Sequence, residues 1–127
     1  MAYAAKYFEN NPVNIYCICG DGEFSEGSCW EALQFAHLYK LNNLITIIDV
    51  NRLGQSEEAP YKHDMVFLKK RLDGFGVNTL KIDGHDLSAI IDSFQKATKT
   101  KEKPTVILAK TFKGKDCSEE VIPQFSY

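Results

Sequence analysis

Hydrophobic residues in this chain form two alternating kinds of pattern. Four short, almost continuous apolar runs predict strands, at residues 14–19, 44–50, 78–82 and 105–109. Between these runs, apolar residues recur every three or four positions and predict three helices, at residues 25–40, 65–75 and 87–97. A further short helix is expected within residues 1–8. The chain therefore alternates strands and helices along almost its whole length.

This alternation predicts an α/β fold, because short strands joined by helices favour right-handed crossovers and parallel pairing. The expected architecture is a three-layer sandwich with a mainly parallel sheet and helices on both faces. No internal repeat or linker-like segment interrupts the pattern, so one domain is expected. In such sheets, ligands bind beyond the carboxyl ends of the strands.

Composition supports a single folded domain and argues against nucleic-acid and membrane partners. The 127 residues are 44% hydrophobic and 25% charged, which is enough to bury a core. The net charge is −2 with acids and bases interspersed, so no nucleic-acid partner is expected. The sequence has no apolar run of membrane length, so no membrane partner is expected either, and a cytoplasmic location is the expectation.

The cysteines give a weaker signal. Cys17 and Cys19 lie on the first predicted strand, so both should point to the same face with Ile18 opposite. Such a pair could contribute to a soft-metal site, but no further pair completes it at zinc-like spacing. We therefore favour small buried residues as the interpretation. Cys117 lies in a polar tail and is expected to be a free thiol.

The strongest chemical signal is a carboxylate between two glycines, followed after the next strand by an amide. Asp21 lies in Gly20-Asp21-Gly22 directly after the first strand, and Asn51 directly follows the second. A carboxylate repels a phosphate unless a divalent cation lies between them. Magnesium takes six oxygen ligands, often shared between a few protein groups, water and phosphates. Asp21, Asn51 and a backbone carbonyl near Leu53 are the candidate protein ligands.

Other features of this loop suit a diphosphate. Gly22 lets the backbone approach phosphates closely, and the following helix offers free N–H groups to the same anion. Lys110, at the end of the fourth strand, is a possible additional cation. An EF-hand would need glycine where Glu26 stands, and the spacing of a dinucleotide fingerprint or a P-loop is absent.

Two longer motifs identify a family resemblance. Residues 20–32 read Gly-Asp-Gly-Glu-x-Ser-Glu-Gly-Ser-x-Trp-Glu-Ala, and residues 49–56 read Asp-Val-Asn-Arg-Leu-Gly-Gln-Ser. Together with Ala-Lys-Thr-Phe-Lys-Gly at residues 109–114, they closely resemble transketolase. The resemblance implies the thiamine-diphosphate-binding (PP) type of fold, as a partial domain over residues 1–115, with a divergent tail over residues 116–127.

The resemblance also implies roles for particular residues. The family's metal ligands, for Mg²⁺ or another divalent cation such as Ca²⁺, match Asp21, Asn51 and the Leu53 carbonyl. Its positions that contact the diphosphate of thiamine diphosphate match Gly22, Asn51 and Lys110, and Gln55 corresponds to a position near the thiazolium ring. No catalytic residue within this chain is implied.

Two acidic residues of the helix predicted at residues 25–40 match family positions at the dimer interface. Glu26 and Glu31 resemble the acids that link the two active sites there. The alternatives are that Glu26 only favours the helix dipole and that Glu31 lies on a solvated face. None of the three histidines is expected to be catalytic: His85 should lie at a helix cap or turn, His37 should be structural although it lies away from the apolar stripe of its helix, and His63 should be exposed in a loop.

The implied activity is transfer of a two-carbon ketol unit between sugar phosphates in the pentose phosphate pathway. Because the pyrimidine-binding domain is absent from these residues, we expect the isolated chain to be inactive. A homodimer or pairing with a transketolase subunit is expected. The alternative is a non-catalytic protein that associates with or regulates a full-length transketolase. A third interpretation, a synthase of the same cofactor group, fits the two motifs less well.

Overall fold

The computed structural model describes residues 1–11, 13–54 and 57–115. Its elements follow the order expected from the sequence: α1 Ala2–Tyr7, β1 Ile15–Gly20, α2 Gly27–Leu38, β2 Leu44–Val50, α3 Met65–Gly74, β3 Asn78–Asp83, α4 Leu87–Lys99 and β4 Thr105–Lys110. A short 3₁₀ turn, η1, covers Glu23–Ser25 between β1 and α2. The predicted strands and helices are thus confirmed.

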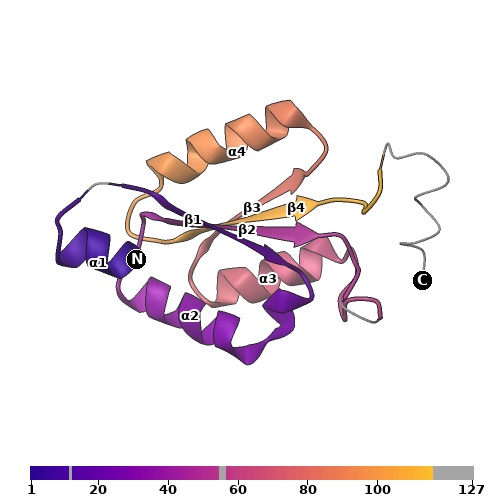
Figure 1. Cartoon of the computed structure of the whole chain (residues 1–127), viewed down its shortest axis with the longest axis horizontal. Helices are drawn as coiled ribbons and strands as arrows, with labels where there is room; N and C mark the ends of the chain where they lie inside the picture. The colour runs from indigo at the N-terminus through magenta and orange to yellow at the C-terminus, as the bar shows by residue number, and fades with distance from the viewer. Residues whose placement is uncertain (12, 55–56, 116–127) are drawn as a thin grey trace.

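The four strands form one parallel sheet in the order β1-β2-β4-β3. Figure 1 shows α4 on one face of this sheet and α2 and α3 on the other, so the molecule has three layers. The α/β three-layer fold with a parallel sheet is therefore confirmed. Within the described ranges β1 and β3 are edge strands, whereas β2 and β4 are paired on both sides.

The core has a compartment on each face of the sheet. The larger compartment lies under α2 and α3 and contains Phe24, Leu33, Ile48, Val50, Leu72, Val77, Val106 and Leu108. The compartment under α4 contains Ile45, Ala97 and Ile107. β4 is almost wholly apolar because both of its faces are covered, as expected for a central parallel strand.

The helix starts differ in how they are capped. Asp64 caps α3 by accepting a hydrogen bond from Phe67 N at 2.9 Å. Two serines, Ser25 and Ser28, are candidate caps near the start of α2, but its N-cap is Glu26 and no side chain makes the capping hydrogen bond. The reason is the preceding 3₁₀ turn, in which the Ser25 hydroxyl donates instead to the Asp21 carbonyl at 3.2 Å.

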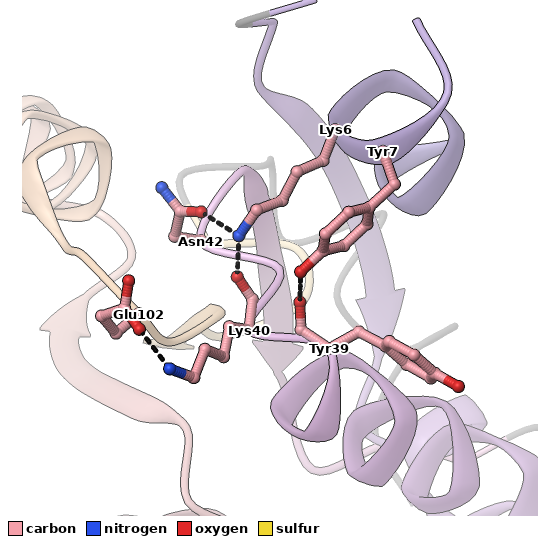
Figure 2. Close-up of polar contacts among 6 residues, drawn as sticks. All are labelled: Lys6, Tyr7, Tyr39, Lys40, Asn42 and Glu102. Carbon is pink, nitrogen blue, oxygen red and sulfur yellow. Dashed lines mark hydrogen bonds and ion pairs between the residues drawn. The ribbon is translucent and has the colours of Figure 1, made fainter. Parts of the chain in front are cut away.

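The segment that follows α2 anchors the N-terminal helix. Figure 2 shows Lys6 of α1 donating to the Lys40 carbonyl at 2.5 Å and to Asn42 Oδ1 at 2.9 Å. Lys40 in turn pairs with Glu102 at 2.6 Å. These contacts lie just before β2 and β4, at the amino ends of the strands. The loops that carry the candidate site lie at the opposite, carboxyl ends of the strands.

The helices in the described part of the chain are all too short or too polar to cross a membrane.

Candidate functional site

The carboxyl ends of β1 and β2 bring Asp21 and Asn51 to the same edge of the sheet. Gly20 pairs in register with Asp49, and the Asp21 N–H donates to the Asp49 carbonyl at 3.1 Å. Asp21 Oδ2 accepts a hydrogen bond from the backbone N–H of Arg52 at 2.7 Å. Because Arg52 directly follows Asn51, the carboxylate and the amide belong to loops in direct contact.

Asp21 is a buried carboxylate whose loss of hydration is offset by only two backbone hydrogen bonds among those described. Its residue is 8% exposed, and its two oxygens accept from the N–H groups of Gly22, at 2.9 Å, and Arg52. Burial raises the pKa of the Asp21 carboxyl above its ordinary value, and the nearby Asp49 charge adds to this, although the two backbone N–H groups act in the opposite direction. A divalent cation would offset both unfavourable effects.

Asp49 orients the Asn51 amide. The Asn51 Nδ2 group donates to Asp49 Oδ2 at 2.8 Å, while Asn51 Oδ1 accepts from Leu53 N at 2.9 Å. The hydroxyl of Thr111 donates to the other oxygen of Asp49. The amide oxygen is thereby turned toward the loop after β2. Sequence reasoning missed Asp49, and the available signal was a single carboxylate within a strand that is apolar except for Thr46.

Glycine allows the two loops to approach closely. A Cβ atom on Gly22 would lie 3.3 Å from Gly54 Cα and 3.8 Å from the Leu53 carbonyl oxygen. These three residues line a hollow of about 820 Å³. Among its described lining residues are four glutamates and no lysine or arginine: Glu23, Glu26, Glu57 and Glu58. An anion would be repelled from this surface unless a cation accompanied it.

The residues present fit a magnesium ion shared with a ligand. Asp21, Asn51 and the Leu53 carbonyl offer only oxygen atoms, which hard cations prefer. Within the described ranges, no group of three or more His, Cys, Asp or Glu side chains could hold a metal by itself. Magnesium sites often have few protein ligands and take the remainder from water and phosphate. The donor set is therefore appropriate for a cation that binds together with a diphosphate.

Comparison with known proteins identifies the family. Residues 2–121 match the family described as "Transketolase, thiamine diphosphate binding domain". The chain belongs to this transketolase family. It is 53% identical to Transketolase-like protein 2 of Mus musculus and 50% identical to human transketolase, each over 115 residues. These alignments cover 91% of this chain but 18% of each relative.

Solved transketolase structures agree with this assignment. The crystal structure of transketolase from Campylobacter jejuni superposes with a TM-score of 0.78 at 36% identity, over 87% of this chain and 18% of that one. Transketolase from Leishmania mexicana superposes with a TM-score of 0.72 at 27% identity. The recognition of the diphosphate-binding domain is confirmed. The chain spans about a fifth of the length of these relatives.

The other predicted site residues of this transketolase-family chain lie in different places. Lys110 is at the end of β4, with its Nζ atom 5.7 Å from the centre of the Phe112 ring, and lines a separate hollow with Met65 and Asp83. Its contact with a diphosphate stays a prediction. Gln55 lies outside the described residues.

The two predicted interface acids are both accessible. Glu26 is exposed and lines the large hollow, and Glu31 is exposed on α2. Their role at a dimer interface stays a prediction.

The histidines hold loops together, as expected of structural residues. His85 Nε2 accepts from the Phe112 N–H at 2.9 Å, which places it in a loop contact, because Asp86 caps α4. His37 Nδ1 lies 3.1 Å from the Gly76 carbonyl. The expectation of an exposed His63 is wrong: the side chain is half-buried, and its Nε2 atom contacts the Thr111 carbonyl at 2.9 Å.

Proposed function

We propose that this chain binds the diphosphate of thiamine diphosphate through a divalent cation, Mg²⁺ or Ca²⁺, held by Asp21, Asn51 and the Leu53 carbonyl. The observation that supports this most strongly is the 2.7 Å hydrogen bond from the Arg52 N–H to the Asp21 carboxylate. It joins the two loops that carry the proposed ligands. The family match to a thiamine diphosphate binding domain supports the choice of cofactor.

Each residue has a defined task in this proposal. Asp21 supplies negative charge to the cation, and Asn51 supplies a neutral oxygen whose direction Asp49 maintains. Gly22 leaves room for the phosphates because no Cβ atom occupies the space before Gly54. The proposal also includes two positions carried over from the family, Lys110 toward the diphosphate and Gln55 toward the thiazolium ring.

The complete enzyme would transfer a two-carbon ketol unit between sugar phosphates, as a transketolase of the pentose phosphate pathway. When bound, thiamine diphosphate supplies the carbanion chemistry, and the protein supplies binding and orientation. The matched region is the diphosphate-binding domain alone, so we expect the isolated chain to bind the cofactor without turnover. Robust ketol transfer by the purified chain would contradict this expectation. A cytoplasmic location is part of the same proposal.

Calorimetric titration of the full chain tests the binding proposal. Thiamine diphosphate should bind in the presence of Mg²⁺ and lose at least about tenfold in affinity after chelation of the metal. Asp21→Ala should cause a loss of the same order, because the remaining amide and carbonyl carry no charge. Asp92→Ala, which removes an exposed carboxylate of α4, is the matched control and should bind like the wild type.

The result that would overturn the proposal is equally direct. Thiamine diphosphate that binds with the same affinity with and without Mg²⁺, or to Asp21→Ala as to the wild type, has no metal bridge at this site. Circular dichroism of the variant separates loss of a ligand from loss of the fold.

A second candidate function is non-catalytic association with a full-length transketolase subunit. The observation that favours it is Ile18, a large apolar residue that is 75% exposed on the edge strand β1. Exposed edge strands readily pair with other chains. Co-purification of a transketolase subunit with the chain, without ketol transfer by the chain itself, would distinguish this function from the first.

A further inference from the structure

We propose that Cys17 and Cys19 form a two-thiolate site for a soft monovalent cation, Cu(I), at the open edge of the sheet. This site is separate from the candidate magnesium site, whose ligands are all oxygen atoms. Thiolates select soft ions such as Cu(I), whereas magnesium prefers oxygen. The two sites would therefore not compete for the same metal.

Strand geometry brings the two sulfur atoms together. Residues two apart on a strand point to the same face, and the Sγ atoms of Cys17 and Cys19 lie 3.7 Å apart. Two bonds of about 2.3 Å to one ion, at roughly 110–120°, would separate the sulfurs by about 3.8–4.0 Å. The observed separation thus suits a shared ion with almost no movement of the backbone.

The same geometry is less suitable for a disulfide. The sulfurs would have to approach to about 2.05 Å, and residues two apart on an extended strand have Cα atoms roughly 6.6 Å apart, near the upper limit for a disulfide. An edge strand would have to bend to close that bond. A bridging ion needs no such distortion.

Accessibility also supports this site. Among the described residues β1 pairs with β2 alone, and Cys17 is exposed while Cys19 is half-buried. The expectation that both are buried core residues is therefore wrong for Cys17. Since the described residues provide no third ligand of the His, Cys, Asp or Glu type, a closed four-ligand zinc site is excluded there. Cu(I) accepts two protein thiolates and can take a third ligand, such as a low-molecular-weight thiol, from solution.

Charge and protons balance in this step. Each thiol releases one proton to water as its sulfur bonds to the metal, and copper stays in the Cu(I) state, so no oxidant or reductant is consumed. Burial, together with the neighbouring Cys17, raises the pKa of Cys19 to about 12, so Cys19 enters the step as a thiol. Two thiolates and one monovalent cation leave one negative charge, less than two free thiolates would carry.

The test is an anaerobic titration of the reduced full chain with Cu(I), supplied as its acetonitrile complex and competed by the chromophoric chelator bicinchoninate. All proteins carry Cys117→Ser, so that the tail thiol does not contribute. We expect one Cu(I) per chain, and at least about a tenfold loss of affinity in Cys17→Ser and in Cys19→Ser, because each variant loses chelation. Cys29→Ser, which removes the other described cysteine, is the matched control and should stay within about threefold of the parent protein, which carries Cys117→Ser alone.

A second measurement, thermal unfolding, distinguishes loss of the Cu(I) site from loss of the fold. Cu(I) should raise the melting temperature of the parent protein and of Cys29→Ser, because a ligand that binds only the folded state stabilises it. Cu(I) should not change the melting temperature of the double variant Cys17→Ser/Cys19→Ser. Unaltered Cu(I) affinity in that double variant, or an equal loss in Cys29→Ser, would overturn the proposal.

Discussion

A single carboxylate in a buried strand determines how the candidate site presents its amide. Asp49 receives the Asn51 Nδ2 group at 2.8 Å and the Thr111 hydroxyl, so the amide oxygen can only face the opposite way. Oxygen and nitrogen of an amide have nearly the same shape, and only the hydrogen-bond partner distinguishes their positions. Asp49 therefore acts as a positioning residue for the proposed ligand.

Asp49→Asn should consequently weaken binding of thiamine diphosphate in the presence of Mg²⁺. The substituted amide can donate as well as accept, so it no longer determines which atom Asn51 directs to the cation. We expect a loss of about tenfold or more, the usual effect of removing a partner that orients a metal ligand. Calorimetry measures it, with Asp92→Asn as the matched carboxylate-to-amide control. Wild-type affinity in Asp49→Asn would show that the contact has no positioning role.

The raised pKa of Asp21 predicts a specific pH dependence in metal-free protein. The folded state binds the Asp21 proton more tightly than the unfolded chain does. The contribution of Asp21 to the free energy of unfolding is therefore greatest below its unfolded pKa, and it declines as the pH rises through the raised, folded pKa. Asp21→Asn lacks this titration, because an amide does not ionise in that range.

Urea unfolding of both proteins at a series of pH values tests this sign. The stability of the wild type relative to Asp21→Asn should fall as the pH rises from strongly acidic values toward neutrality. A difference that is constant or increases with pH would contradict the assignment. Addition of Mg²⁺ and thiamine diphosphate should reduce the decline, because the cation stabilises the ionised carboxylate.

At the scale of elements, the helix starts show where local sequence is a sufficient guide. Asp86 precedes the apolar periodicity of α4 and accepts hydrogen bonds from the N–H groups of Ser88, at 2.9 Å, and Ala89, at 3.2 Å. α2 has two serines near its start, yet neither caps it, because the 3₁₀ turn redirects Ser25 to the Asp21 carbonyl. Asp21 is in turn held by the Asp49 carbonyl and the Arg52 N–H, so the partner that Ser25 finds is positioned by tertiary contacts.

Asp86→Ala should lower the free energy of unfolding by about 1 kcal/mol, as typical of losing an N-cap. The two N–H groups of the first turn would then depend on water alone. Chemical denaturation measures the change, and Asp92→Ala, later in the same helix, is the control, which should alter stability by less than about 0.5 kcal/mol. A loss no greater than that of the control would show that the cap contributes nothing.

At the scale of the whole molecule, the sheet has an exposed apolar edge. Tyr16 and Ile18 of β1 are 51% and 75% exposed. They lie on the same face of the sheet as α4, but that helix leaves most of both side chains uncovered. Tyr16 contacts Phe94 of α4 edge to face at 5.7 Å, whereas Ile18 has no place in either core compartment. An open strand with an apolar side chain favours pairing with another chain.

We therefore expect the purified chain to self-associate, and we expect Ile18→Lys to shift it toward the monomer. A charge on an edge strand opposes edge-to-edge pairing. Sedimentation velocity over a range of protein concentrations measures the distribution. Leu87→Lys is the control, since Leu87 is 70% exposed but lies on α4 and not at the sheet edge. A monodisperse monomer for the wild type would contradict the expectation.

The sequence by itself determined the elements, the fold class and the loop segments of the candidate site. These follow from patterns that are local in the chain, such as apolar runs, helical periodicity and the glycines around Asp21. The resemblance of residues 20–32 and 49–56 to transketolase was sufficient for the family.

Only the tertiary structure decided the strand order, the placement of Cys17 at an open edge and the contact of Asp49 with Asn51. The order β1-β2-β4-β3 inserts the last strand between its predecessors, and nothing within a single segment encodes that choice. Pairing between distant segments depends on which whole arrangement buries the most apolar surface. Whether a strand residue is buried or exposed is therefore decided by its neighbours in the sheet as much as by its own sequence.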